Sequence, residues 1–197
     1  MERNLLGAFE IGSRLGAGGM GEVWHGRHRS QNVDVAIKVI TGPSVVSKAL
    51  QRSFRREVVA VAGLCHPAVV TVLDHGVVPS SSTSLPEGSP YLVMELGSEA
   101  LCDRPPTAWA GVYAALRDML AGLAHAHARG VIHRDLKSAN VLRLGTRWSL
   151  CDFGLAHMLD DPGEQGFGGT PNTMAPEQWQ RRWRDFGPWT DLYGLGC

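Results

Sequence analysis

The stretch "HRDLKSAN", residues 133–140, is the strongest indication of fold and chemistry in the chain. Asp135 and Asn140 are separated by four residues, and Lys137 lies between them. A carboxylate at Asp135 can orient an attacking hydroxyl group and accept its proton, and the amide oxygen of Asn140 can bind Mg²⁺. Lys137 can neutralise charge that develops on a transferred phosphoryl group. The spacing therefore predicts a catalytic loop for phosphoryl transfer.

Two motifs downstream extend this prediction. Asp152 of "DFG" (152–154) follows Asn140 by twelve residues and supplies a second hard oxygen ligand for Mg²⁺. "APE" at 175–177 closes the segment that begins at Asp152. We therefore expect Asn140 and Asp152 to be the metal ligands.

The glycine-rich stretch "GAGGMGEV", residues 16–23, has glycines at Gly16, Gly18 and Gly21. This pattern also occurs in dinucleotide-binding turns, but such a turn opens a helix, whereas "EVWHGRH" continues as a strand. A glycine-rich hairpin tip can lay its backbone over phosphates without steric obstruction. A plain tight hairpin is the alternative.

Lys38 ends "VAIK", an otherwise apolar strand, and a buried lysine needs a charged partner. Glu57 is the candidate, because it shares a helical stripe with Phe54, Val58 and Val61. Such a pair would aim the Lys38 ammonium group at nucleotide phosphates. A snorkelling lysine and a partly exposed glutamate form the alternative interpretation.

Composition excludes several classes of protein. The chain has 197 residues, 44% of them hydrophobic, and 19 basic residues balance 19 acidic ones. Zero net charge gives no global field for nucleic acid or an anionic membrane. Four scattered cysteines and no long apolar segment predict a cytoplasmic chain without a membrane span. No oligomeric state follows from these features.

The order of the expected strands and helices predicts an α+β fold. We expect strands at residues 9–16, 21–27, 33–40, 68–78 and 91–96, and a helix over 47–63. A loop should span residues 79–90. Further on, we expect a long helix over 108–128, two short strands at 140–144 and 147–152, and a helix that starts within 190–197. A hinge near residues 95–97 would divide two lobes, residues 1–96 and 97–197.

Together, the motifs resemble those of eukaryotic-like (Hanks-type) serine/threonine protein kinase domains, of the bacterial kind, from about Phe9 to Cys197. The resemblance implies a two-lobed protein-kinase-like fold, with an antiparallel β-sheet and one helix in the N-lobe and a mostly helical C-lobe. It also implies ATP, Mg²⁺ (with Mn²⁺ as an alternative) and a protein Ser/Thr substrate.

The resemblance assigns further residues. Those of the adenine site are Leu15, Val23 and Ala36 above the ring, Leu142 below it, Met94 as gatekeeper, and the Glu95 carbonyl and Gly97 amide as hydrogen-bonding groups. Val61, Val72, His133 and Phe153 would stack as a spine. Thr170 would contact Asp135, and Asp191 would anchor the catalytic loop.

Two other functions are alternatives. A pseudokinase scaffold usually lacks one of four residues that are all present here, namely Lys38, Asp135, Asn140 and Asp152. Small-molecule phosphotransferases generally lack a segment like "GTPNTMAPE" (169–177). The family continues through further helices, including the arginine that pairs with Glu177. We therefore expect a C-terminally truncated domain, poorly stable or inactive alone.

The loop "MLDDPGEQGFGG", residues 158–169, has carboxylates but no hydroxyl groups. In many relatives a phosphorylated residue in this loop pairs with the arginine that is Arg134 here. Our hypothesis is that Asp160, Asp161 or Glu164 replaces that phosphate; the alternative is that these carboxylates are solvated. Thr173 is a better candidate for phosphorylation than Thr170.

Three clusters remain. His125, His127 and His133 could suggest a metal site, but residues two apart on a helix do not share a face. The aromatic residues Trp179, Trp183, Phe186 and Trp189 could form a partner surface or pack within the C-terminal lobe. Cys151 is expected to be a small buried hydrophobic residue, and the alternative is a reactive thiol at the border of the nucleotide pocket.

Overall fold

The computed structural model describes residues 4–18, 21–41, 54, 58–80, 85–153 and 170–197. The chain divides into two compact units. The first consists of Met1–Ala62 with Thr71–Leu96, and the second of Gly63–Val70 with Gly97–Cys197.

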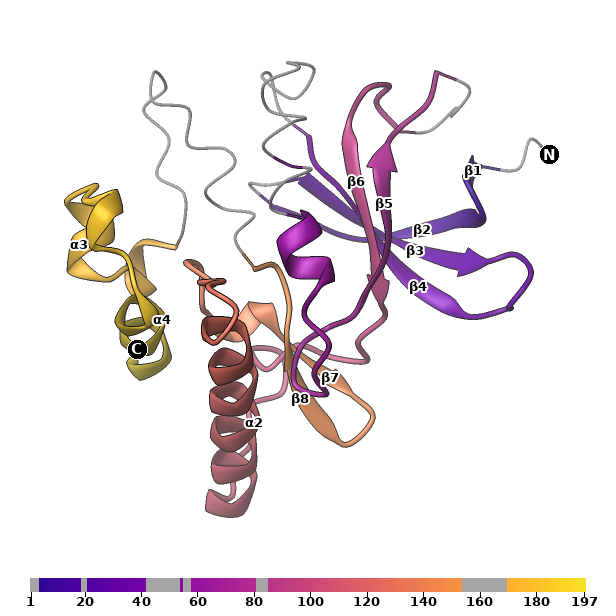
Figure 1. Ribbon diagram of the computed structural model, residues 1–197. Coiled ribbons are helices and arrows are strands. Elements are labelled where there is room, and N and C mark those ends of the chain that lie inside the picture. The colour runs from indigo at the N-terminus through magenta and orange to yellow at the C-terminus, as the bar shows by residue number, and fades with distance from the viewer. Residues whose placement is uncertain (1–3, 19–20, 42–53, 55–57, 81–84, 154–169) are drawn as a thin grey trace. The chain divides into compact units, whose positions relative to one another are not determined.

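The first unit contains a six-stranded antiparallel sheet (Figure 1). Its strands are β1 (Leu5–Leu6), β2 (Phe9–Gly18), β3 (Gly21–His28), β4 (Asp34–Val39), β5 (Val72–Val77) and β6 (Pro90–Glu95), in the order β1-β2-β3-β4-β6-β5. Sequence patterning predicts every strand except β1, which has only two residues and so shows no alternation.

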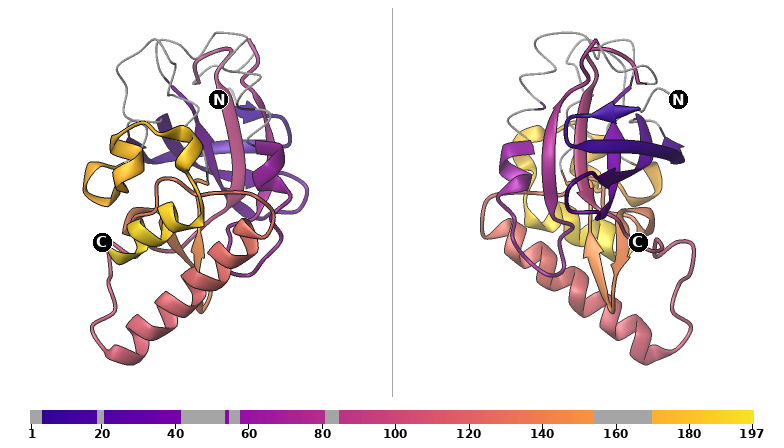
Figure 2. Two further views of the ribbon diagram at one scale, coloured as in Figure 1. Left: turned by 60° about the vertical axis from the view of Figure 1, so that its left-hand side comes forward. Right: turned by 90° about the vertical axis from the view of Figure 1, so that its right-hand side faces the viewer.

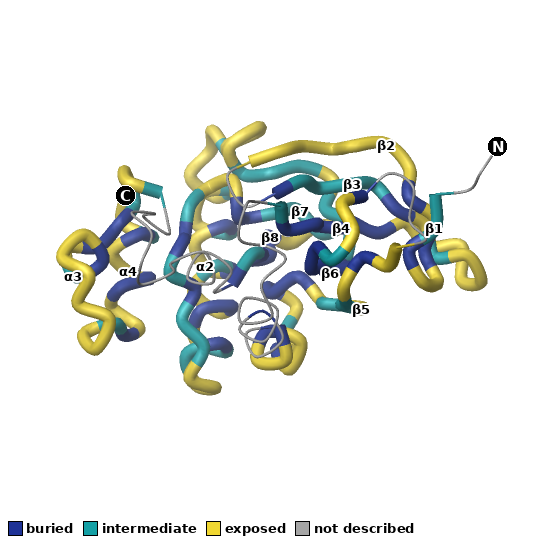
Figure 3. Tube along the Cα trace, turned by 90° about the horizontal axis from the view of Figure 1, so that it is seen from above, coloured by how far each residue is buried: buried dark blue, intermediate teal, exposed yellow. Residues whose placement is uncertain are grey.

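One face of this sheet holds the hydrophobic core of the first unit. Its buried members are Leu6, Phe9, Ile11, Val35, Ile37, Val39, Val78, Leu85, Tyr91 and Val93. Since side chains alternate between faces along a strand, Ala36 and Lys38 of β4 lie on the opposite face. Most of β2 is exposed (Figure 3).

The strand expected over residues 68–78 is two separate pieces, so that prediction is wrong in its extent. Val69 bridges Leu150 in the second unit, and the amide of Val70 donates to the Leu150 carbonyl. Only residues 72–77 join the sheet, as β5. An apolar run cannot show by itself which partners its two ends will choose.

The helix expected over residues 47–63 falls partly outside the described residues. Phe54 and residues 58–62 are helical, and Gly63 lies in a turn. Phe54, Val58 and Val61 are buried, as their helical spacing predicts. Glu57, the expected partner of Lys38, lies outside the described residues.

The second unit is built on one long helix and one hairpin (Figure 2). These are α2 (Trp109–His127), β7 (Val141–Leu144) and β8 (Arg147–Leu150), followed by α3 (Pro176–Trp179) and α4 (Pro188–Gly196), with short 3-10 turns η1 (Ser138–Asn140), η3 (Pro171–Thr173) and η4 (Trp183–Asp185). No helix of the described chain is long and apolar enough to cross a membrane.

Small residues bring α2 close to its neighbours. Ala115, Gly122 and Ala126 are buried on one side of the helix. A Cβ at Gly122 would lie 2.6 Å from the Ala68 carbonyl oxygen. Asp118 on the same side accepts the Trp148 amide of β8 at 3.2 Å. This packing holds β8, which leads directly to Asp152.

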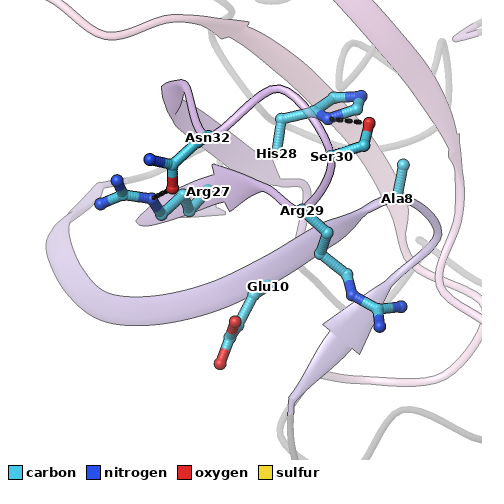
Figure 4. Close-up of a pocket in the computed structure, with 7 residues that line it drawn as sticks. All are labelled: Ala8, Glu10, Arg27, His28, Arg29, Ser30 and Asn32. Atoms are coloured by element: carbon cyan, nitrogen blue, oxygen red, sulfur yellow. Dashed lines mark hydrogen bonds between the residues drawn. The ribbon is translucent and has the colours of Figure 1, made fainter.

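A surface pocket of the first unit lies at the turns that join β1 to β2 and β3 to β4 (Figure 4). It is lined by Ala8, Glu10, Arg27, His28, Arg29, Ser30 and Asn32. None of the residues predicted to bind nucleotide or metal lines this pocket.

Substituting Gly122→Ala tests the packing of α2. The added methyl group must displace backbone, so we expect the unfolding free energy to fall by about 1–3 kcal/mol. The control is Gly196→Ala at the end of α4, where an added Cβ meets nothing within 4 Å. Chemical denaturation would measure both variants, and equal stability of the two would contradict the described packing.

Candidate active site

The catalytic loop joins α2 to β7 and is held by one buried carboxylate. Asp191, in the first turn of α4, is 1% exposed. Its Oδ2 accepts the backbone N–H of His133 and its Oδ1 accepts that of Arg134, both at 2.8 Å. The Nε2 atom of His127 lies 2.7 Å from Oδ2. Asp191 thus anchors the loop, as the resemblance implies.

Asp135 lies at the centre of a hydrogen-bond network. Lys137 Nζ donates to its Oδ2 at 2.8 Å, and the Thr170 hydroxyl donates to its Oδ1 at 2.9 Å. Lys137 Nζ also donates to Thr170 Oγ1 at 2.8 Å. The Asp135 side chain is 3% exposed. The expected contact between Thr170 and Asp135 is confirmed, and it brings the segment after residue 169 to the carboxylate.

Asn140 is oriented by Asp135. Its Nδ2 atom donates to the Asp135 carbonyl at 2.8 Å and to Oδ2 at 3.2 Å. Both donations use the amide nitrogen, so the amide oxygen remains as the potential metal ligand.

The residue before Asp152 is hydrogen-bonded to the catalytic loop. The Cys151 amide donates to the Asn140 carbonyl at 3.0 Å. Cys151 is buried, as expected for a small hydrophobic residue. Asp152 has a φ of 62°, in the left-handed region that non-glycine residues rarely adopt. A carboxylate and an amide oxygen are ligands that suit Mg²⁺.

His133 is fully buried, and its ring packs on Phe153 with centroids 4.6 Å apart. Burial lowers the pKa of this imidazole, against smaller raising effects of Asp191, Asp135 and Asp152. A neutral ring can accept the Asp135 amide at Nδ1, where the distance is 3.4 Å. The His133–Phe153 part of the expected spine is therefore in contact within the second unit.

Two residues near the "APE" motif have contacts that sequence reasoning missed. Gln178 accepts the Ala175 amide at 3.0 Å and donates to the Arg134 carbonyl at 2.7 Å. Glu177 accepts the Thr190 hydroxyl at 2.7 Å. The only signal for Gln178 is its position three residues into a helix start, as in a capping box.

The two neighbouring histidines of α2 have different partners. His127 pairs with Asp191, whereas the His125 ring lies 4.9 Å from that of His66, centroid to centroid. Their spacing of two residues on a helix accounts for this divergence.

The glycine hairpin is formed by β2 and β3, which pair Gly18 with Gly21. Gly21 has a φ of 133°, and a Cβ there would lie 2.0 Å from the Val39 carbonyl oxygen, so this position requires glycine. Around Gly16 and Gly18, an added Cβ would meet nothing within 4 Å. The backbone at these two positions is open to a ligand.

The strand register gathers the predicted nucleotide residues of the first unit on one face. Gly16 pairs with Val23, and Val23 pairs with Lys38. Ala36 pairs with Met94. Directly paired residues share a face, as do residues two apart on a strand. This face is the one opposite the core.

The remaining adenine-site candidates belong to both units. Leu15 is 52% exposed. Glu95 donates its amide to the Thr71 carbonyl at 3.1 Å, and its Oε2 accepts the Thr71 amide at 2.8 Å. In the second unit, a Cβ on Gly97 would lie 2.8 Å from the Leu142 Cβ, so these two residues are in close contact.

Asp160, Asp161 and Glu164, the proposed stand-ins for phosphate, lie outside the described residues, so their pairing with Arg134 stays a prediction. The guanidinium carbon of Arg134 lies over the ring of Phe186, 5.9 Å from the centroid. The other large aromatics of that cluster, Trp179, Trp183 and Trp189, are 45–60% exposed.

Comparison with known proteins assigns the class to which this arrangement belongs. Residues 9–197 match the protein kinase domain family, and the chain belongs to that family. The expected α+β kinase fold is confirmed by a crystal structure of the Mycobacterium tuberculosis PknI kinase domain. That structure has 27% identity and a TM-score of 0.73, over 99% of this chain and 73% of that one.

Bacterial serine/threonine-protein kinases are among the similar curated proteins. Pkn1 of Myxococcus xanthus is 34% identical over 96% of this chain, and PknB of Mycobacterium tuberculosis is 32% identical over 98% of it. The chain spans only 28% and 32% of the length of these two relatives.

Substituting Asp191→Ala should release the catalytic loop. Two buried N–H groups and His127 would lose their acceptor, and we expect the unfolding free energy to fall by at least about 3 kcal/mol. Asp185→Ala, at a half-exposed carboxylate before α4, is the control and should change it little. Denaturation with urea would measure both variants, and a small effect at residue 191 would contradict the anchoring role.

The buried imidazole of His133 predicts a pH dependence of stability. Its folded pKa is lowered from 6.5, so the unfolded chain binds the proton first and acid below about pH 6.5 destabilises the fold. Above that pH, the contribution of neutral His133 to stability is fully present. Below it, the unfolding free energy falls by up to about 1.4 kcal/mol per pH unit. The substitution His133→Gln should flatten the pH dependence of the unfolding free energy. A slope that this substitution leaves unchanged would refute the assignment.

Proposed function

We propose that the protein containing this chain transfers the γ-phosphoryl group of ATP to Ser or Thr hydroxyl groups of proteins. The observation that carries the proposal is the buried Asp135 carboxylate, bonded at 2.8 Å to Lys137 and at 2.9 Å to Thr170. An acceptor hydroxyl that approaches Asp135 would find a carboxylate already oriented to take its proton.

Within this network each side chain has one task. Asp135 orients the acceptor hydroxyl and accepts its proton as the new P–O bond forms and the bond between the γ-phosphorus and the bridging oxygen of ATP breaks, releasing ADP. Lys137 neutralises charge on the transferring group, since its ammonium is already next to Asp135 Oδ2. Thr170 holds the segment that presents the substrate, through its contacts with both residues.

The metal and the nucleotide would use residues that fit them. Asn140 and Asp152 would hold Mg²⁺, or alternatively Mn²⁺, which when bound neutralises phosphate charge. Lys38, with Glu57 as the proposed partner, would contact the α- and β-phosphates, and the open backbone at Gly16 and Gly18 would cover them. The adenine ring would lie among the residues expected for it, namely Leu15, Val23, Ala36, Met94, Glu95, Gly97 and Leu142.

The preference for Ser/Thr over Tyr rests on two supports. Lys137 and Thr170 are the residues that serine/threonine kinases have at these positions, and they are hydrogen-bonded to each other. The relatives are named serine/threonine-protein kinases. Protein substrates are therefore proposed rather than nucleic acid, for which the balanced charge gives no support. The cytoplasmic location stays a prediction.

A nucleotide-binding scaffold without transfer, or an inactive fragment, is the alternative function. Asp135 is hydrogen-bonded to Lys137 and Asn140, and the sequence also contains Lys38 and Asp152. These features favour the kinase.

Substituting Asp135→Asn tests the function. Without a proton acceptor, transfer of labelled phosphate from ATP to a Ser/Thr-containing protein should fall by about 10²–10⁴-fold. Binding of Mg²⁺-ATP, measured as a rise in Tm, should persist. The comparison variant is Lys38→Met. Because this substitution should weaken nucleotide binding, the rise in Tm on addition of Mg²⁺-ATP should itself be smaller.

Two results would contradict the proposal. Transfer that persists in Asp135→Asn would remove this residue from its role. Stabilisation by Mg²⁺-ATP without any transfer by the unmodified protein would favour the scaffold instead.

A further inference from the structure

Arg134 is unusually constrained for a charged residue. Its backbone N–H donates to Asp191 and its carbonyl accepts from Gln178. Its φ of 68° lies in the left-handed region, which costs free energy in a non-glycine residue. The next residue in the chain is Asp135, so any change in the Arg134 backbone moves the proposed catalytic carboxylate.

The guanidinium group of Arg134 is not held in the same way. Its Nε atom is buried and has no hydrogen-bond partner among the described residues. Among the described residues, the guanidinium group contacts an aromatic ring face. The guanidinium carbon lies 5.9 Å from the centroid of the Phe186 ring. A cation within about 6 Å of a ring face is attracted by the ring's quadrupole.

Phe186 is itself fixed in place. The Trp183 ring packs against it, with centroids 5.3 Å apart. The indole of Trp189 donates to the Asp185 carbonyl at 3.0 Å, and the Gly187 amide donates to Thr190 Oγ1 at 3.2 Å. The residues on both sides of Phe186 are therefore tied, which makes the ring a rigid platform.

We propose that Phe186 is a positioning residue for phosphoryl transfer, holding the Arg134 guanidinium group through a cation–π contact and thereby fixing the neighbouring Asp135. The role rests on the proposed function. Under this proposal, the aromatic cluster of Trp179, Trp183, Phe186 and Trp189 supports the catalytic loop of the second unit.

The first test compares kcat for phosphoryl transfer. Phe186→Leu keeps an apolar side chain but removes the ring face, so kcat should fall by roughly 3- to 30-fold with little change in the KM for ATP. Phe186→Tyr keeps the face and should restore activity. Tyr193→Leu, at a half-exposed aromatic residue of α4, is the matched control and should leave kcat unchanged.

A double-mutant cycle decides whether Phe186 acts through Arg134. In an Arg134→Met background there is no cation to hold, so adding Phe186→Leu should reduce kcat no further. An equal fold-reduction in both backgrounds would show that the ring is merely structural and would overturn the proposal.

A measurement that needs no activity separates this inference from the proposed function. Protons of the Arg134 side chain over the ring should show an upfield NMR shift in the unmodified chain that is lost in Phe186→Leu and kept in Tyr193→Leu. Absence of this shift would overturn the positioning role. A protein that shows the shift but transfers no phosphate would instead contradict the proposed function, while the Arg134–Phe186 contact stands.

Discussion

The buried carboxylate of Asp191 is the interaction on which the second unit depends. It accepts two successive backbone N–H groups, those of His133 and Arg134, and pairs with His127. A buried carboxylate needs hydrogen-bond partners, and these three groups supply them to both of its oxygens. Three segments, the end of α2, the catalytic loop and α4, are thereby tied to one side chain.

This anchoring explains how a loop keeps an unfavourable backbone shape. Left-handed conformations at Arg134 and Asp152 persist because the surroundings over-determine them. Between these positions Asp135 is bonded by Lys137, Thr170 and Asn140 before any substrate is present. A site organised in advance does not have to reorganise during the reaction, and such preorganised groups stabilise the charge that develops in the transition state.

Local spacing in the sequence was enough to predict the catalytic loop and most strands, because these patterns depend on neighbours in the chain. Contacts between distant residues were harder. The Gln178 donation to the Arg134 carbonyl joins residues 44 apart and has almost no sequence signal. Asp191 was found only through resemblance to a family. The division of residues 68–78 between two units depended on Leu150, which no local pattern reveals.

Hydrogen exchange at the amides of His133 and Arg134 tests the central claim most directly. If Asp191 holds both groups in a buried site, they should exchange as slowly as the most protected amides of α2, opening only with the whole second unit. Exchange as fast as that of amides in exposed turns would show that the carboxylate does not hold the loop, and would contradict this account of the active site.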